Sequence, residues 1–123
     1  MKVIQFIILF IFMPGYLLYA ASYRSGEVVR LSEGDTLFSD LIVASRVVEI
    51  QGNLQGDAYS ACQELTVEGE INDDLIAAAR SVTIRGLVKD MVVGFGEKIT
   101  IDGEVGGDVL AFGGEVRITE GAH

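Results

Sequence analysis

Apolar and polar residues alternate along most of the chain, in short stretches that recur at a constant interval. Val48 and Ile50, for example, flank a glutamate, and the same pattern returns at Leu65 and Val67, each 17 further along. Alternation with a period of two indicates β-strands. Glycines and other small residues follow these stretches and are typical of bends between strands. We therefore expect short strands joined by tight bends.

The constant interval defines five consecutive units without insertion or deletion, 40–56, 57–73, 74–90, 91–107 and 108–123. Four sets of apolar residues recur at this interval, and we call each set a column. The columns are Leu41, Ala58, Leu75, Val92 and Val109; Val48, Leu65, Val82, Ile99 and Val116; Ile50, Val67, Ile84, Ile101 and Ile118; and Leu54, Ile71, Val88 and Val105. Another column contains only glycine, at Gly52, Gly69, Gly86 and Gly103. Residues 23–39 fit the interval poorly, so we expect an N-terminal capping segment there.

A unit of this length is too short for a helical repeat hairpin, which needs about 33 residues. It suits one coil of a parallel β-helix, in which neighbouring coils cover each other's apolar side chains and build a continuous core. The sequence thus predicts an all-β fold, a single-stranded parallel β-helix or solenoid of about five coils over 40–123. We expect it to be right-handed, because a left-handed helix of hexapeptides would prefer about 18 residues per coil. Because the last unit stops one residue short, we expect the coils to continue beyond His123.

Residues 1–22 do not belong to the repeat. Lys2 precedes an apolar run, Pro14 and Gly15 interrupt it, and small residues follow. This order is typical of a secretory signal peptide. An uncleaved membrane anchor is the alternative, because the apolar residues are just numerous enough to span a bilayer. Both interpretations predict an exported protein that is periplasmic or membrane-associated.

Composition excludes several classes of function. The chain has 123 residues, with 9 Lys plus Arg against 18 Asp plus Glu, and this acidic balance argues against nucleic-acid binding. Its single cysteine, Cys62, excludes an intramolecular disulfide and a CxxC metal or redox site. No glycine pattern of a phosphate loop is present, so we expect neither a nucleotide nor another cofactor. A catalytic site should interrupt the repeat rather than follow it, and we expect no catalytic residues and no enzyme activity.

One acidic column is the only candidate metal site. Its members are Asp40, Asp57, Asp74 and Asp108, with Met91 in the fourth unit. Carboxylates about 5 Å apart repel by roughly 1 kcal/mol in water, so backbone N–H groups, the nearby Arg46 and Arg80, or a cation must offset the repulsion. A hydrogen bond within the turn is the favoured interpretation. Calcium binding at Asp40, Asp57 and Asp74 is the alternative.

An apolar stripe is expected on one outer face of the solenoid. If Leu41 and Leu75 point inward, the alternate residues of the same strands point outward, and most of these are apolar. The interaction stripe consists of Ile42, Tyr59, Ile76, Val93, Leu110, Phe95 and Phe112, with Ala44, Ala61 and Ala78 beside them. A contiguous apolar face usually marks a contact surface. We expect lateral pairing of copies, or contact with a membrane or an envelope protein, and coverage by further chain is the alternative.

The repeat resembles that of the bactofilins, polymer-forming bacterial cytoskeletal proteins. The resemblance is clearest in GEVGGDVLAFGGEVRITEG at 103–121 and in the recurring G-x-[ILV]-x-x-D-[LVA], and it covers about residues 35–123. It implies a right-handed β-helix that polymerises end to end into filaments without nucleotide. The export signal departs from typical bactofilins, which are cytoplasmic or held at the inner membrane face.

These observations lead to an expected function. We expect a non-enzymatic, polymer-forming scaffold protein of the bacterial cell envelope, with further copies of itself as its main partner. The alternative is an exported β-helical binding module for polysaccharide or for an envelope protein. Electron microscopy would separate the two, because only the first forms filaments.

Overall fold

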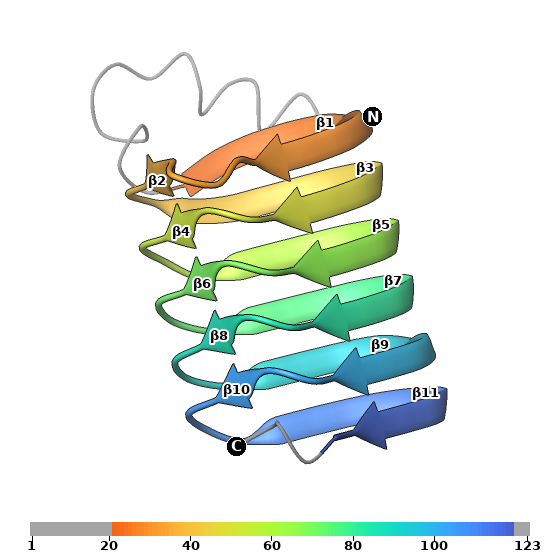
Figure 1. Cartoon of the computed structure of the whole chain (residues 1–123). Coiled ribbons are helices and arrows are strands. Elements are labelled where there is room, and N and C mark those ends of the chain that lie inside the picture. Colours follow the sequence, from red (N-terminus) through yellow and green to blue (C-terminus); the bar gives the residue numbers. More distant parts are fainter. Residues whose placement is uncertain (1–20, 120–123) are drawn as a thin grey trace.

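The computed structural model describes residues 21–119, and in that range the chain consists of strands, turns and loops without a helix. Long and short strands alternate and wind the chain into a solenoid (Figure 1). The long strands are β1 (Ala21–Leu31), β3 (Asp40–Ile50), β5 (Ala58–Val67), β7 (Leu75–Ile84), β9 (Val92–Ile101) and β11 (Val109–Ile118). The short strands are β2 (Thr36–Leu37), β4 (Asn53–Leu54), β6 (Glu70–Ile71), β8 (Leu87–Val88) and β10 (Glu104–Val105). A long strand and the short strand after it make one coil.

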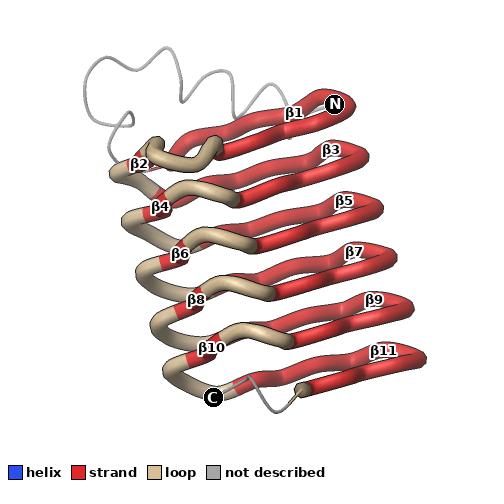
Figure 2. Tube along the Cα trace, in the orientation of Figure 1, coloured by secondary structure: helices blue, strands red, loops and turns tan. Residues whose placement is uncertain are grey.

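Every strand pairs in parallel with the equivalent strand of the next coil. The long strands form a six-stranded sheet in the order β1-β3-β5-β7-β9-β11, and the short strands form a five-stranded sheet in the order β2-β4-β6-β8-β10. From β3 onward, the paired residues of neighbouring coils are 17 positions apart in the sequence, as Leu75 and Val92 are. The coils therefore lie one above another (Figure 2). The predicted single-stranded parallel β-helix is confirmed.

Each coil has three sides, because the long strand bends near its middle (Figure 2). In β3 the ladder of residues paired with β5 stops after Ala44 and resumes at Val47. We call the side before the bend face A, which comprises residues 41–44 of β3 and the residues paired with them. The side after the bend, residues 47–50 and their paired residues, is face B. The short strands form face C.

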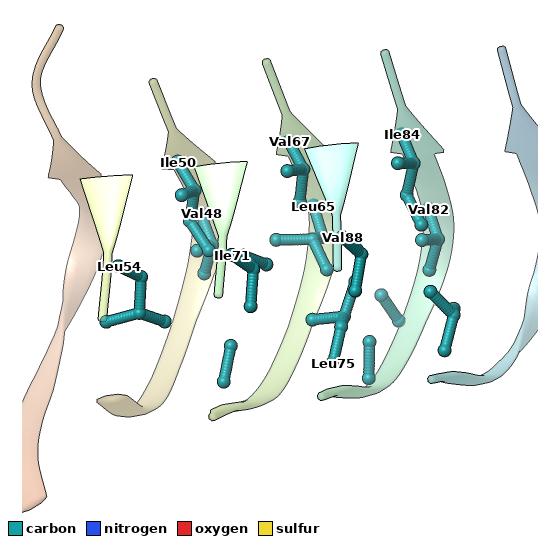
Figure 3. Packing of buried hydrophobic residues seen from close by; sticks show 14 of the residues in the cluster. Val48, Ile50, Leu54, Leu65, Val67, Ile71, Leu75, Val82, Ile84 and Val88 are labelled. Atoms are coloured by element: carbon teal, nitrogen blue, oxygen red, sulfur yellow. The ribbon is translucent and has the colours of Figure 1, made fainter. Parts of the chain in front are cut away.

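Side chains that point inward from the three faces form one continuous core. Leu41 from face A, Val48 and Ile50 from face B and Leu54 from face C are all buried. Figure 3 shows how the face B and face C side chains of successive coils meet. Burying one such side chain contributes about 1.5–3 kcal/mol. All four predicted inward columns are buried from β3 to β10, which confirms the predicted register.

The segment 23–39, expected to be a cap, takes part in a further coil, in which β1 pairs with β3 and β2 pairs with β4. The partners in β1 and β3 are 19 apart in the sequence, as Val29 and Val48 are, whereas those in β2 and β4 are 17 apart. The two additional residues lie in the turn between β1 and β2. There the Asp35 N–H donates to the Ser32 carbonyl at 3.0 Å, and Gly34 has a φ of +88°, which glycine adopts at little cost. The expected five coils are therefore six, because a strict interval misses a coil with a longer turn.

At β11 the core is open. Val116 and Ile118 continue the two inward columns of face B, as their pairing with β9 confirms, yet 43% and 57% of their surfaces are exposed. Val109, which continues the face A column, is half-buried. These side chains are covered only by β9, because no described coil follows β11. The equivalent face B residues of β1, Val29 and Leu31, are buried.

Two predictions concern residues near the ends of the sequence. The expected export signal, 1–22, lies outside the described residues except for Ala21 and Ser22, which begin β1. In residues 21–119, no helix has the length and apolar character needed to cross a membrane. The expected continuation of the coils beyond His123 also lies outside the described residues.

Candidate functional site

The aspartate column links successive coils through hydrogen bonds. Oδ1 of Asp40 accepts the backbone N–H of Asp57 at 2.8 Å, and Oδ1 of Asp57 accepts the N–H of Asp74 at the same distance. Oδ1 of Asp74 then accepts the N–H of Met91 at 3.0 Å. These donors carry partial positive charge and stabilise the stacked carboxylates. Backbone N–H groups of the next coil thus offset part of the repulsion, whereas the hydrogen bond expected from the sequence lay within the turn.

A tyrosine hydroxyl also lies close to the aspartate column. The Tyr59 hydroxyl lies 3.4 Å from Oδ2 of Asp57. Burial, followed by the negative charges of Asp57, Asp40 and Asp74, raises the pKa of Tyr59. Within residues 21–119, no group of three or more His, Cys, Asp and Glu side chains is placed to hold a metal ion. Asp40, Asp57 and Asp74, the residues of the calcium alternative, each link two coils through these hydrogen bonds.

Arg46 and Arg80, which the sequence offered as partners for the aspartate column, pair with glutamates instead. They belong to a column at the bend between faces A and B, which we call the bend column: Glu27, Arg46, Gln63, Arg80, Glu97 and Gly114. Arg46 Nε donates to Glu27 at 2.7 Å, and Arg80 Nε donates to Glu97 at 2.9 Å. The hydrogen bond to Glu97 and the charge of that carboxylate raise the pKa of Arg80. The bend column therefore contains cations and anions in equal number.

Face A carries the predicted apolar stripe on its outer side. Its residues alternate with the buried residues of the same strands. Ile42, Tyr59, Phe95, Leu110 and Phe112 are exposed, and Ile76 and Val93 are half-buried. The rings of Phe95 and Phe112 stack with centroids 5.2 Å apart and 10° between their planes. All seven predicted residues thus lie on the outward side of their strands, over five coils, and their role as a contact surface stays a prediction.

The stripe consists of two parallel columns of different size. One column is large throughout, with Ile42, Tyr59, Ile76, Val93 and Leu110. The other contains Ala44, Ala61 and Ala78, followed by Phe95 and Phe112. The aspartate column borders the stripe on one side, and the bend column borders it on the other. The stripe is therefore apolar between one acidic edge and one edge of mixed charge.

Face B has a different outer surface. Arg30 Nε lies 2.7 Å from Oε2 of Glu49, and Lys98 Nζ lies 3.8 Å from Oε2 of Glu115. Such exposed ion pairs contribute little to stability, because water and salt screen them. They do keep the face soluble and discourage non-specific apolar contact. Face B thus differs from face A in both polarity and charge.

A groove of about 630 Å³ follows the edge between faces B and C across five coils. Its lining consists of Gly34, Asp35, Thr36, Gln51, Gly52, Asn53, Gly69, Glu70, Arg85, Gly86, Leu87, Asp102, Gly103 and Glu104. The glycine column permits the close approach of the coils here, because a Cβ on Gly69 would lie 2.0 Å from the Gly52 carbonyl oxygen. Our prediction from sequence missed this groove. Polar columns on both sides of the glycines were the signal that could have revealed it.

The groove offers hydrogen-bonding groups of both kinds. Glu70 is paired with Lys89 at 2.9 Å, whereas Arg85 forms no ion pair within residues 21–119. The amides of Gln51 and Asn53 add donors and acceptors. Apart from Leu87, the residues that line the groove are polar residues and glycines. An extended polar chain is the kind of ligand that such a shallow, open groove could hold.

Cys62 is a half-buried thiol at the bend. Its Sγ lies 3.4 Å from the Ser60 hydroxyl. Burial is the main cause that raises the pKa of Cys62. Because the thiolate is the reactive form, this environment disfavours nucleophilic reactivity.

Comparison of the chain with protein-family models, with curated proteins and with solved structures finds no match. The fold is established by strand pairing alone, as a parallel β-solenoid of six coils. Three surface features remain as functional candidates: the open core at β11, the apolar stripe of face A and the groove beside the glycine column.

Proposed function

We propose that the chain is a non-enzymatic scaffold protein of the cell envelope that forms polymers by stacking its solenoids end to end without nucleotide. The observation that carries the proposal is the open core at β11, where Val116 and Ile118 are exposed although they belong to the inward columns. The repeat's resemblance to the bactofilins supports the same interpretation. Export would distinguish this chain from typical members of that family.

The physical basis is the edge strand β11 of the six-stranded sheet. The forward edge of β11 has no strand partner among the described residues, and an unpaired strand edge is a template for another chain. A second copy that adds there would continue the backbone ladder and cover both side chains. Burying them contributes up to about 1.5–3 kcal/mol each. Neither interaction needs a nucleotide.

Electron microscopy of the purified full chain, without nucleotide, tests this proposal. Filaments are expected for the natural sequence. Val116→Glu combined with Ile118→Glu should abolish them, because the new charges would be buried in the contact. Arg117→Glu is the matched control, since its side chain lies between these two on the outward side of the strand. Single particles from the natural sequence, or filaments from the double variant, would refute end-to-end stacking.

Export is proposed from residues 1–22 and is tested separately. Expression of the full chain in a bacterium, followed by fractionation and intact mass measurement, should recover the protein outside the cytoplasm. Cleavage near the end of this segment would leave a chain shortened by about 20–22 residues. Recovery of the intact chain from the cytoplasm would contradict the proposed location while leaving the stacking proposal intact.

The groove favours a second candidate, an exported module that binds polysaccharide. It presents amide, carboxylate and guanidinium groups along five coils. A neutral polysaccharide retained by a single-particle protein would favour this function. Gln51→Ala combined with Asn53→Ala should then release the polysaccharide, whereas Thr83→Ala on face B should not.

A further inference from the structure

We propose that two stacked filaments pair side by side through face A, with their solenoid axes pointing in the same direction. The two copies would be related by a two-fold axis parallel to the solenoid axis. The proposal rests on the proposed function, because it needs stacked copies. It goes beyond that function by assigning the apolar stripe to a second copy in a defined orientation.

The two borders of the stripe decide the orientation. Rotation about an axis parallel to the solenoid exchanges left and right, so the aspartate column of one copy faces the bend column of the other. Rotation about an axis along the strands keeps left and right, so each aspartate column faces its equivalent. Only the first arrangement keeps the two acidic edges apart.

The charges of the two borders favour pairing in the same direction over pairing in opposite directions. The aspartate column carries four carboxylates, Asp40, Asp57, Asp74 and Asp108. The bend column carries two arginines and two glutamates, which sum to zero. Pairing in opposite directions would place one column of four carboxylates along another across an interface of reduced polarity, where like charges repel more strongly than in water. Pairing in the same direction places Asp40 and Asp74 opposite Arg46 and Arg80, and the other two carboxylates opposite uncharged residues.

The sizes of the two stripe columns point to the same orientation. In same-direction pairing the large column of one copy faces the other column of its partner at the same height. Ile42, Tyr59 and Ile76 then meet Ala44, Ala61 and Ala78, and large side chains fit against small ones. Pairing in opposite directions would set each column against itself. The closest contact is therefore expected over β3, β5 and β7.

The area of face A explains why pairing should require filaments. Six strands about 4.8 Å apart, each with four residues of about 3.3 Å, present roughly 400 Å² per copy. A stable interface of standard size needs about 800 Å² per partner. One copy therefore offers about half of what a stable pair requires. Stacking places many stripes on one line, and the contacts then add along the filament.

A membrane is a less suitable occupant of the stripe. The chain has a net charge of −9, and one border of the stripe consists of aspartates. Bacterial lipid surfaces are anionic and attract basic segments rather than acidic ones. The ion-paired arginines of the bend column provide no excess of positive charge. A second copy matches both the apolar surface and its charged borders.

Microscopy of the full-chain filaments tests the pairing. Paired filaments are expected, and class averages that resolve the coils should show a two-fold axis along the filament. Ile76→Glu combined with Val93→Glu should give single filaments of unchanged length. Thr83→Glu combined with Thr100→Glu is the matched control, because it adds the same charge to face B of the same coils. A two-fold axis across the filament, or pairing that survives the face A charges, would overturn the inference.

Two further measurements keep the test decisive. Leu110→Thr combined with Phe112→Ser removes exposed apolar surface without a buried charge, so it should also separate filaments even if the first variant folds poorly. Flotation with vesicles of phosphatidylethanolamine and phosphatidylglycerol should leave the protein unbound. Binding that the Leu110 and Phe112 changes abolish would assign the stripe to lipid and overturn pairing. Filaments that never pair refute this inference alone, whereas absence of filaments refutes the proposed function as well.

Discussion

The coils of β7 and β11 contain the same columns but differ in burial. Val82 and Ile84 of β7 are completely buried, while Val116 and Ile118 of β11 are 43% and 57% exposed. Strand register is the same, since the residues of each strand are 17 apart from their partners in the preceding coil. The difference is that β7 has a coil on both sides. The coils on both sides of β7 therefore complete the burial of its core, as neighbouring repeats do in solenoids generally.

The central coils and the coil of β11 also differ in the aspartate hydrogen bonds that link one coil to the next. Asp40, Asp57 and Asp74 each accept a backbone N–H from the next coil, so the first links are continuous. Met91 has no carboxylate to extend this series to Asp108. Beyond its backbone ladder and one-sided apolar contact, β11 is held by the Lys98–Glu115 ion pair and by a hydrogen bond from Thr119 to Asp102. This contrast can be tested by changing central residues and, where the chain offers one, a counterpart near β11.

The largest effect is expected from a charge in the core. Ile84→Asp should lower the free energy of unfolding by more than about 4 kcal/mol, because the carboxylate would be buried without a partner. Ile118→Asp should cost less than about 1 kcal/mol, because its position is exposed and water can reach the charge. Chemical denaturation followed by circular dichroism measures both. Equal losses would show that the two coils are equally covered in solution.

The next effect concerns close backbone contact. Gly69→Ala should destabilise the fold by about 1–3 kcal/mol, because the new Cβ would lie 2.0 Å from a carbonyl oxygen of the preceding coil. Gly114→Ala near the last bend should change stability by less than about 0.5 kcal/mol, since its nearest atom would be 3.4 Å away. Thermal unfolding of both variants provides the comparison. A neutral Gly69→Ala would mean that the coils can separate locally at little cost.

A smaller effect is expected from the aspartate links. Asp57→Ala should cost about 1–2 kcal/mol, because the N–H of Asp74 loses its acceptor. Asp57→Asn is the control and should cost less, since its side-chain oxygen can still accept that hydrogen bond. In the coil of β9, Met91→Asn should raise stability by up to about 1 kcal/mol by offering an acceptor to the N–H of Asp108 in the next coil. Chemical denaturation of the three variants measures these changes, and a stabilising Asp57→Ala would show that repulsion exceeds the hydrogen bonds.

The smallest effect is a pH dependence at Tyr59. Burial and the nearby aspartates raise the pKa of this phenol, so the folded state holds its proton more tightly than the unfolded state. The resulting stability is complete below about pH 10, the ordinary pKa of tyrosine, and is lost as pH rises through the raised value. Ultraviolet titration should detect a late-ionising phenol that Tyr59→Phe removes. Asp57→Asn should bring its pKa closer to the ordinary value, and an unchanged titration would contradict the assigned cause.

The outer surfaces show how far the sequence could predict a candidate site. Alternation placed Ile42, Tyr59 and the other stripe residues outward, and the structure confirms this because each adjacent residue is buried or faces the core. The same reasoning could not find the partner of Arg46, which is Glu27 in a coil with a longer turn. Nor did it find the groove, which depends on how closely the glycine column brings the coils together.

By itself, the sequence determined the repeat, the inward columns and the parallel β-solenoid, because equal spacing and alternation leave few other ways to bury so many apolar side chains. Only the tertiary structure decided that residues 21–39 form a sixth coil, that aspartates bind backbone N–H groups and that Val116 and Ile118 stay exposed. The physical reason is that the position of a residue in the repeat predicts only whether its side chain points inward or outward from its strand. Burial and bonding depend on what lies above and below, which only the stacked coils define.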